Sequence, residues 1–327
     1  MKTMFPIALI AVLGLVGCSD SSDGTLIIYS GRGEELVQPL IDEFEEQSGI
    51  QVEVRYADST EHAATLLQEG ESTDADVFYS QDPASLGSVA GLMSTLDDSL
   101  LDKVDARFAD RDGRWVGTSG RVRVFVYDTD TSKDLPQTID EVNDPAWAGQ
   151  IGVAPTNGSF LAFVSAMILE RGEDATLEWL RELAANDPQD FPGNAPIVTA
   201  VDDGELEAGL VNHYYLLRLR AEGAGARAEN WFIPAGDVGS LVMPAGAAIL
   251  ANSDMADEAE QFVEFLLSEE AQQHFATVTY EFPLIVGVEP AEGLPALSEI
   301  NAPDIDLSRL ADVLEDATRL VSEAGLV

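Results

Sequence analysis

Apolar and polar positions recur along the chain in blocks that predict a first α/β unit close to the N-terminus. The unit alternates three strand-like with two helix-like segments, at residues 25–30, 34–47, 50–56, 61–69 and 75–79. Leu36, Leu40 and Phe44 recur at helical spacing in the first helix, whereas Val52 and Val54 alternate with polar residues in the second strand. The order β-α-β-α-β predicts a sheet that carries helices on both faces.

A second unit of the same kind is predicted in the middle of the chain. Its strand-like and helix-like segments lie at residues 151–154, 160–170, 177–185, 197–203 and 206–212. Two extended apolar passages, 116–127 and 239–250, lie before and after this unit, and residues 255–275 have the spacing of one amphipathic helix. Two lobes joined by two extended strands would form a hinged clamp, so we expect a ligand between the lobes.

The first residues predict export. Lys2 precedes an apolar run over residues 5–16, which is the order of a secretory signal and is shorter than a membrane span of about 20 residues. The run ends in Leu-Val-Gly-Cys at residues 15–18, which resembles the bacterial lipobox, and Cys18 would then carry the lipid. An ordinary signal with a chance cysteine is the alternative. Cys18 is the single cysteine, so we expect no disulfide.

We expect the chain to divide into five parts. These are a lipoprotein signal peptide at 1–17, a tether at 18–23, an N-lobe of 24–118 and 245–290, a C-lobe of 119–244, and a C-terminal helical segment of 291–327. No later apolar stretch reaches spanning length, so we expect membrane contact through the lipid anchor only. The expected location is the outer face of the cytoplasmic membrane or the periplasm, and the expected state is a monomer.

The charge of the chain narrows the choice of partner. The chain has 59 acidic and 17 basic residues, and its formal net charge is −42. Nucleic acid is excluded as a partner, because neutralising phosphates requires clustered Lys and Arg. The acidic residues are spread along the chain, which indicates a hydrated surface and suggests a salt-rich habitat. A GC-rich genome would also deplete Lys, so the habitat is a hypothesis.

Three corners between a strand and a helix are candidate anion sites. They are residues 30–33, 155–159 and 193–196, and each precedes a predicted helix. The N-terminus of a helix offers free N–H groups and partial positive charge, which favour an anion. Ordinary helix capping is the alternative for any single corner. Arg121 and Arg123 on the linking strand favour an anion-containing cleft.

Tyr214 and Tyr215 follow His213 at the end of the apolar strand 206–212. Adjacent side chains of a strand point to opposite faces, so the two rings can converge only if the chain leaves the strand there. One interpretation is a core Tyr beside a surface Tyr. The other is a pair of phenolates on a hard cation such as Fe(3+), which prefers oxygen ligands and can displace the phenol proton.

Several segments resemble the ferric-ion-binding proteins of bacterial iron ABC transporters. The similar segments are 25–32, 76–81, 120–127, 155–160 and 194–215. The resemblance runs over nearly all of the mature chain. The spacing from Asn194 to the Tyr pair is the most specific feature of this resemblance. The resemblance implies an α/β fold of the two-lobed periplasmic-binding-protein type II class with two hinge strands.

The resemblance also implies roles for individual residues. Tyr214 and Tyr215 match the phenolate ligands of the iron. The positions that match anion-binding residues, for a carbonate or phosphate that completes the coordination, are Asn157, Gly158, Ser159, Asn194, Asn212 and Arg121. Arg32 stands at the first corner, where we expect it to contact the anion.

Two positions depart from the best-known members of the family. A family His falls at or beside Gly33, which has no side chain, and a family Glu falls on Gln81, whose carbonyl oxygen is a weaker ligand. Iron would therefore have fewer protein ligands, with the anion, water or another Tyr completing the set. Tyr29, Tyr79 and Tyr127 are expected in the core.

The resemblance implies a lipoprotein that captures ferric iron with an anion for delivery to an ABC permease and its ATPase. The rival is a metal-free receptor for a small anion or a polyamine, for which Asp82, Trp115 and Trp231 could serve. An enzyme is not expected, because we find no nucleophile elbow, phosphate-binding loop or zinc-protease motif. His62, His213 and His274 lie far apart, and a surface position is expected for each.

Overall fold

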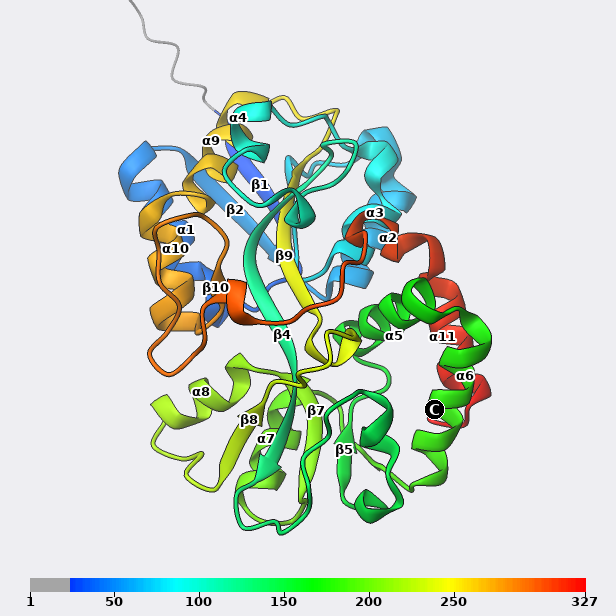
Figure 1. The fold of residues 1–327 in the computed structure, drawn as a ribbon. Coiled ribbons are helices and arrows are strands. Elements are labelled where there is room, and N and C mark those ends of the chain that lie inside the picture. The colour runs from blue at the N-terminus through cyan, green and yellow to red at the C-terminus, as the bar shows by residue number, and fades with distance from the viewer. Residues whose placement is uncertain (1–23) are drawn as a thin grey trace, which may run out of the picture.

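The computed structural model describes residues 24–327, which form two α/β lobes that meet at a waist (Figure 1). The strands are β1 Thr25–Ser30, β2 Gln51–Tyr56, β3 Val77–Ser80, β4 Val116–Asp128, β5 Ile151–Val153, β6 Gln189–Asp190, β7 Ala208–Asn212, β8 Ala228–Trp231, β9 Val242–Ile249 and β10 Phe282–Pro283. The α/β fold with two lobes predicted from the sequence is therefore confirmed.

The strand β4 belongs to both lobes. Within the described residues the strand order is β2-β1-β3-β9-β4-β7-β5-β6, with β8 and β10 also paired to β4. Residues Val116–Val122 of β4 pair with β9, whereas Arg123–Tyr127 pair with β7. The strands β1, β2 and β3 run parallel, as a β-α-β-α-β unit requires, and β9 joins β3 in the antiparallel sense.

Helices cover both sheets. They are α1 Glu34–Ser48, α2 Ser59–Glu69, α3 Pro83–Ser88, α4 Asp98–Leu101, α5 Gly158–Arg171, α6 Glu173–Ala185, α7 Asn194–Asp202, α8 Tyr214–Ala221, α9 Ala256–Leu266, α10 Glu269–His274 and α11 Leu314–Glu323. The prediction of one helix over 255–275 was wrong. The helix is interrupted after Leu266, and Ser268 starts α10 by accepting the Ala271 N–H at its side chain.

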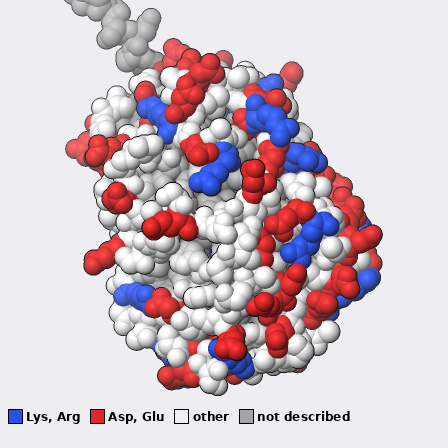
Figure 2. Space-filling model, in the orientation of Figure 1, with Lys and Arg blue, Asp and Glu red and all other residues white. Residues whose placement is uncertain are grey.

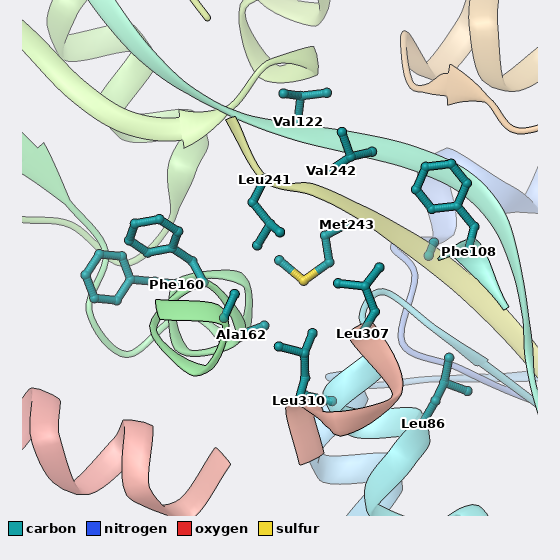
Figure 3. Packing of buried hydrophobic residues seen from close by; sticks show 14 of the residues in the cluster. Leu86, Phe108, Val122, Phe160, Ala162, Leu241, Val242, Met243, Leu307 and Leu310 are labelled. Atoms are coloured by element: carbon teal, nitrogen blue, oxygen red, sulfur yellow. The ribbon is translucent and has the colours of Figure 1, made fainter. Parts of the chain in front are cut away.

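An apolar joint lies where the lobes meet (Figure 3). The 3₁₀ segment η9, Leu307–Val313, packs between α3 of one lobe and α5 of the other. Leu307 and Leu310 are buried beside Met243, which follows directly from Val242 at the start of β9. The last helix, α11, packs on α5 and α6, so the C-terminal segment ends on the second lobe.

Acidic side chains are distributed over the visible face, and basic side chains are few and stand beside acidic ones (Figure 2). Arg319, for example, pairs with Glu173 and Asp316. Within residues 24–327, no helix combines the length and the apolar character that a membrane crossing needs. Cys18 and the predicted signal peptide and tether lie outside the described residues.

Candidate functional site

The two tyrosines converge because the chain leaves the strand immediately before them. Strand β7 ends at Asn212, and α8 begins at Tyr214. The rings of Tyr214 and Tyr215 stack with their centroids 4.2 Å apart and their planes inclined by 27°. Tyr214 is 3% exposed, whereas Tyr215 is only partly buried. The geometry is therefore not that of one core Tyr and one surface Tyr on opposite faces of a strand.

The Tyr214 hydroxyl is held in its neutral form by its surroundings. Burial raises the pKa of this phenol well above its usual value of 10, and the neighbouring Tyr215 raises it further. The positive charges of Arg32 and Arg121 act in the opposite direction. A phenolate at this position needs an additional positive charge close to its oxygen, which a bound cation can supply.

Three buried arginines surround the tyrosines. Arg32, Arg121 and Arg123 are 3%, 1% and 2% exposed, and two of them come from β4. Burial lowers the pKa of Arg32, but the attraction of Glu281 and of the tyrosines outweighs burial and raises it overall. Burial and the repulsion of Arg121 lower the pKa of Arg123 to about 9. Two predicted anion-binding residues, Arg32 and Arg121, thus lie in one charged cluster with the Tyr pair.

Glu281 belongs to this cluster but was not predicted from the sequence. Its carboxylate accepts a hydrogen bond of 2.6 Å from the Arg32 guanidinium, and it lies 3.9 Å from Nε of Arg121. Glu281 is completely buried. A single acidic residue inside the apolar run 280–286 was the signal in the sequence that could have drawn attention to it.

Hydrogen bonds between asparagines assemble the predicted anion corner. The Oδ1 atom of Asn157 accepts hydrogen bonds from the backbone N–H and the hydroxyl of Ser159. Asn157 thereby caps the N-terminus of α5, which begins at Gly158. The Asn194 amide donates weakly to the same oxygen at 3.4 Å, and its own oxygen accepts the backbone N–H of Asn212. The corner is thus continuous from the start of α5 to Asn212, the last residue of β7.

Arg123 of strand β4 supports this corner. Its guanidinium donates to the Ser159 carbonyl oxygen at 2.6 Å and lies 5.1 Å from the centroid of the Phe163 ring. Arg123 therefore fixes the first turn of α5 from the shared strand β4. This position suits a supporting residue more than a direct ligand, since both terminal nitrogens of its guanidinium already donate to backbone carbonyl oxygens, of Leu210 and Ser159.

Gln81, from the first lobe, lies close to the first turn of α5 in the second lobe. A Cβ atom placed on Gly158 would lie 3.5 Å from Nε2 of Gln81, so the Gln81 side chain lies against the first turn of α5. At the other predicted corner, the Glu35 carboxylate lies over Gly33, where an added Cβ would be 2.8 Å from Oε2. Glu35 also faces Arg218 of α8 at 3.6 Å across the lobes.

The predicted surface position was wrong for His213 and for His62. His213 is completely buried and His62 is 5% exposed. The Nδ1 of His213 accepts the backbone N–H of Val122, and Nε2–H donates to the Tyr280 carbonyl oxygen at 2.9 Å. Burial lowers the pKa of His213 to about 3, so the imidazole is neutral. His213 ties the start of α8 to both β4 and the segment that carries Glu281.

The residues proposed for a polyamine are engaged elsewhere. Asp82 caps α3 by accepting the N–H and the hydroxyl of Ser85. Trp115 is fully buried, and Trp231 donates its indole N–H to the Pro136 carbonyl oxygen in the second lobe. Because the three side chains make separate contacts within the protein, they do not form the combined carboxylate and aromatic lining that a polyamine site needs.

Of the three tyrosines expected in the core, Tyr79 is also close to the charged cluster. Its ring is fully buried and packs edge-on against Phe262 at 6.5 Å. Its hydroxyl has no hydrogen-bond partner among residues 24–327, although Arg32 is near enough to influence its pKa, which burial raises. Tyr29 donates its hydroxyl hydrogen to Glu69, away from the cluster.

The chain as a whole is similar to known solute-binding proteins. Residues 72–312 match the family model described as bacterial extracellular solute-binding protein. The chain is 34% identical over 336 residues to the major ferric iron-binding protein of Neisseria meningitidis serogroup B, covering 100% of both chains. It is 30% identical over 340 residues to the Fe(3+)-binding periplasmic protein of Serratia marcescens, covering 100% of this chain and 99% of the relative.

The fold is similar to solved structures of such proteins. The structure of iron-bound HitA from Pseudomonas aeruginosa superposes with a TM-score of 0.86 at 31% identity, covering 92% of this chain and 99% of that chain. The similarity extends over both lobes and the strands that join them. The chain therefore shares its two-lobed framework with an iron-bound protein.

Proposed function

The chain belongs to the bacterial extracellular solute-binding protein family, and from this premise we propose that it captures ferric iron together with a small synergistic anion. It is a solute-binding protein rather than an enzyme. Tyr214 and Tyr215 hold the metal as phenolates, and Gln81 approaches it from the opposite lobe. The observation that carries the proposal is the stacked Tyr pair inside a cluster of buried arginines.

Ferric iron fits the donor set better than a softer metal does. Phenolate oxygens are hard ligands, and Fe(3+) supplies the charge that a buried phenol needs before it releases its proton. Zinc sites in proteins are built mainly from Cys and His. The imidazole nearest to the tyrosines, His213, already uses both ring nitrogens in hydrogen bonds to the backbone.

The charge of the site supports the anion. Arg32 and Arg121 face the carboxylate of Glu281 in a buried environment, and Arg123 is buried beside Arg121. A bound carbonate or phosphate would compensate the excess positive charge and could accept hydrogen bonds from Arg32, Arg121 and the corner at Asn157–Ser159. Asn194 and Asn212 would hold that corner against the Tyr pair. The anion would also occupy a coordination position of the metal that Gly33, which has no side chain, leaves open.

The proposed function includes delivery of the captured iron to an importer in the membrane. We propose that the mature protein is a monomer held at the outer face of the cytoplasmic membrane, or in the periplasm, by a lipid on Cys18. Its partners are the permease and the ATPase of an ABC importer, which receive the iron when the lobes separate. Mass spectrometry of the exported protein tests the anchor, because acylation at Cys18 adds the mass of a lipid to a chain that begins there.

The visible spectrum tests the proposed function. Ferric citrate added to the mature protein with bicarbonate or phosphate should produce a phenolate-to-iron charge-transfer band and an orange or red colour. Tyr214→Phe combined with Tyr215→Phe should abolish the band while leaving the fold intact. A wild-type protein that stays colourless under all these conditions contradicts iron capture.

A metal-free anion receptor is the second candidate, and the three buried arginines favour it. Calorimetric titration with phosphate in a strong chelator separates the two functions. Tight phosphate binding by iron-free protein, combined with a colourless ferric titration, would establish the second candidate in place of the first.

A further inference from the structure

Glu281 is a buried carboxylate that the proposed function does not yet use. Its Oε2 accepts hydrogen bonds from Arg32 at 2.6 Å and from the Thr279 hydroxyl at 3.0 Å. Its Oε1 has no hydrogen-bond partner among residues 24–327 and lies 3.9 Å from Nε of Arg121. One carboxylate therefore stands between two of the arginines that face the Tyr pair.

The neighbouring polar atoms are also incompletely satisfied within the described chain. Nε of Arg32, Nε of Arg121 and the hydroxyl of Tyr79 are buried without a hydrogen-bond partner among these residues. Proteins rarely leave buried polar atoms unpaired, because each costs the free energy of its lost hydration. Several such atoms around one ion pair are typical of a site that holds a polar ligand rather than of a core that serves stability.

The position of Glu281 is fixed by backbone contacts on both sides. Its N–H donates to the Phe275 carbonyl oxygen at 2.9 Å. The preceding residue, Tyr280, has a φ of 60°, an uncommon value for a residue with a side chain, and its carbonyl oxygen accepts the His213 Nε2–H. Because His213 directly precedes Tyr214, the carboxylate and the Tyr pair are placed by one connected set of contacts.

The negative charge of Glu281 affects both the Tyr214 hydroxyl and any anion bound in the cluster. Its charge acts on the Tyr214 hydroxyl together with the charges of Arg32 and Arg121. An anion in the cluster meets the attraction of the arginines and the repulsion of this carboxylate. In a buried site with an effective dielectric constant of about 20, one unit charge a few ångströms away changes an anion's binding constant by more than a factor of about ten.

We propose that Glu281 sets the affinity of the anion site, where it neutralises Arg32 and so limits how strongly a small oxyanion is held. This inference rests on the proposed function, because the anion completes the coordination of the iron. Without the carboxylate, Arg32 would be free to pair with the anion in full. The anion would then bind more tightly, and iron held with it would be released more slowly.

A double-mutant cycle that removes each charge in turn tests this inference through two readouts. The first is phosphate binding to iron-free protein by calorimetry, and the second is the phosphate concentration that gives half of the ferric–phenolate band. Glu281→Gln should lower the half-saturating phosphate by about tenfold or more, and Arg32→Gln should raise it by a similar factor. The double variant, in which neither charge is buried, should lie within about threefold of wild type.

The double variant also decides the matter if Glu281→Gln does not fold, since replacing both members of a buried ion pair is tolerated better than removing one. A double variant that needs about tenfold more phosphate than wild type shows that only Arg32 matters, and overturns the inference. An unchanged or raised half-saturation in a folded Glu281→Gln variant overturns it as well. Failure of the proposed function looks different, because wild type would then give no ferric band while the calorimetric cycle could still be measured.

Discussion

Burial keeps two neighbouring side chains, His213 and Tyr214, uncharged. The low dielectric of the interior disfavours imidazolium and phenolate alike, so the pKa of His213 falls to about 3 and that of Tyr214 rises well above 10. The consequences differ, because only the tyrosine lies where a cation can reverse the effect. His213 acts through its hydrogen bonds, which join α8 to β4 and to Tyr280.

The raised pKa of Tyr214 predicts that iron binding weakens in acid. Ferric iron must displace the phenol proton, and protons compete more strongly as the pH falls. The apparent affinity should drop by up to about tenfold per pH unit for each proton released, measured by competition with citrate. Tyr214→Phe provides the control, because it should bind less iron with a flatter pH dependence. An identical slope in wild type and variant would contradict the phenolate role of Tyr214.

The lowered pKa of His213 predicts a loss of folding stability in acid. The unfolded chain takes up a proton near pH 6.5, whereas the folded chain resists it down to about pH 3. A depressed folded pKa therefore contributes stability that is present above pH 6.5 and is lost as the pH falls, at about 1.4 kcal/mol per unit. His213→Asn keeps an acceptor for Val122 and cannot be protonated, so its unfolding free energy in urea should fall less between about pH 6.5 and pH 5. Parallel profiles would show that His213 is not the group responsible.

At the scale of elements, the anion corner depends on one amide. Asn194 at the start of α7 accepts the Asn212 N–H and donates to Asn157, so it joins α7, β7 and the turn before α5. These contacts connect the predicted anion turn to the Tyr pair without any charged group. The shape of the side chain at position 194 should therefore affect the stability of the corner, whereas its charge should affect the binding of an anion there.

Two variants of Asn194 separate these effects. Asn194→Ala leaves the buried Asn212 N–H unpaired and should lower the free energy of unfolding by about 1–3 kcal/mol. Asn194→Asp keeps the acceptor and the shape but places a negative charge in the corner, so stability should be retained more fully while phosphate binding weakens. Urea unfolding and calorimetry check the two outcomes. Equal loss of both properties in both variants would argue against this division.

The elements themselves were predictable where one face of a helix or strand is apolar. The alternation in 50–56 and the helical spacing in 34–47 arise from burial against a neighbouring layer, so β2 and α1 could be read directly. The break between α9 and α10 was missed, although Ser268 followed by Glu269 is typical of a new helix N-terminus. A continuous apolar spacing obscured that local signal.

The site was predictable only in part. The Tyr pair and the asparagines stand in short motifs of the sequence, and the structure brings the asparagines into one hydrogen-bonded corner. Glu281 and Arg32 are 249 residues apart, and no local pattern shows that they form an ion pair. The same holds for His213, whose burial depends on Val122 and Tyr280 from distant parts of the chain.

At the scale of the whole molecule, the paired strands β4 and β9 run through the junction of the two lobes. We propose that residues 24–118 with 245–290 move against residues 119–244 about the region of Arg121–Arg123, where β4 changes partners from β9 to β7. The apolar joint around Leu307 and Leu310 packs beside Met243 of β9 (Figure 3). We expect this joint to remain packed while the side that carries the charged cluster opens. The charged cluster would then be exposed to solvent only in the open state.

The net charge of −42 predicts that salt stabilises the folded chain. Acidic residues outnumber basic ones by 59 to 17, so repulsion among the excess carboxylates outweighs the attraction within the surface ion pairs. Salt screens the repulsion and the attraction alike. The screening length shortens from about 10 Å at 0.1 M to about 3 Å at 1 M. The midpoint of urea unfolding should therefore rise steadily with KCl over this range. A neutral osmolyte at the same concentration does not screen charges, so its curve of midpoint against concentration should differ from that of KCl. A midpoint that falls with KCl would contradict the dominance of repulsion.

Resonance Raman spectroscopy of the iron-loaded protein is the most direct test of the central claim. Excitation within the visible band should enhance the ring modes of tyrosinate bound to ferric iron in the wild type, with phosphate or carbonate present. Tyr214→Phe with Tyr215→Phe should remove these modes, while Tyr29→Phe, which changes a tyrosine bonded to Glu69 away from the site, should retain them. Iron that binds without tyrosinate modes, or modes that persist in the double variant, would contradict the account.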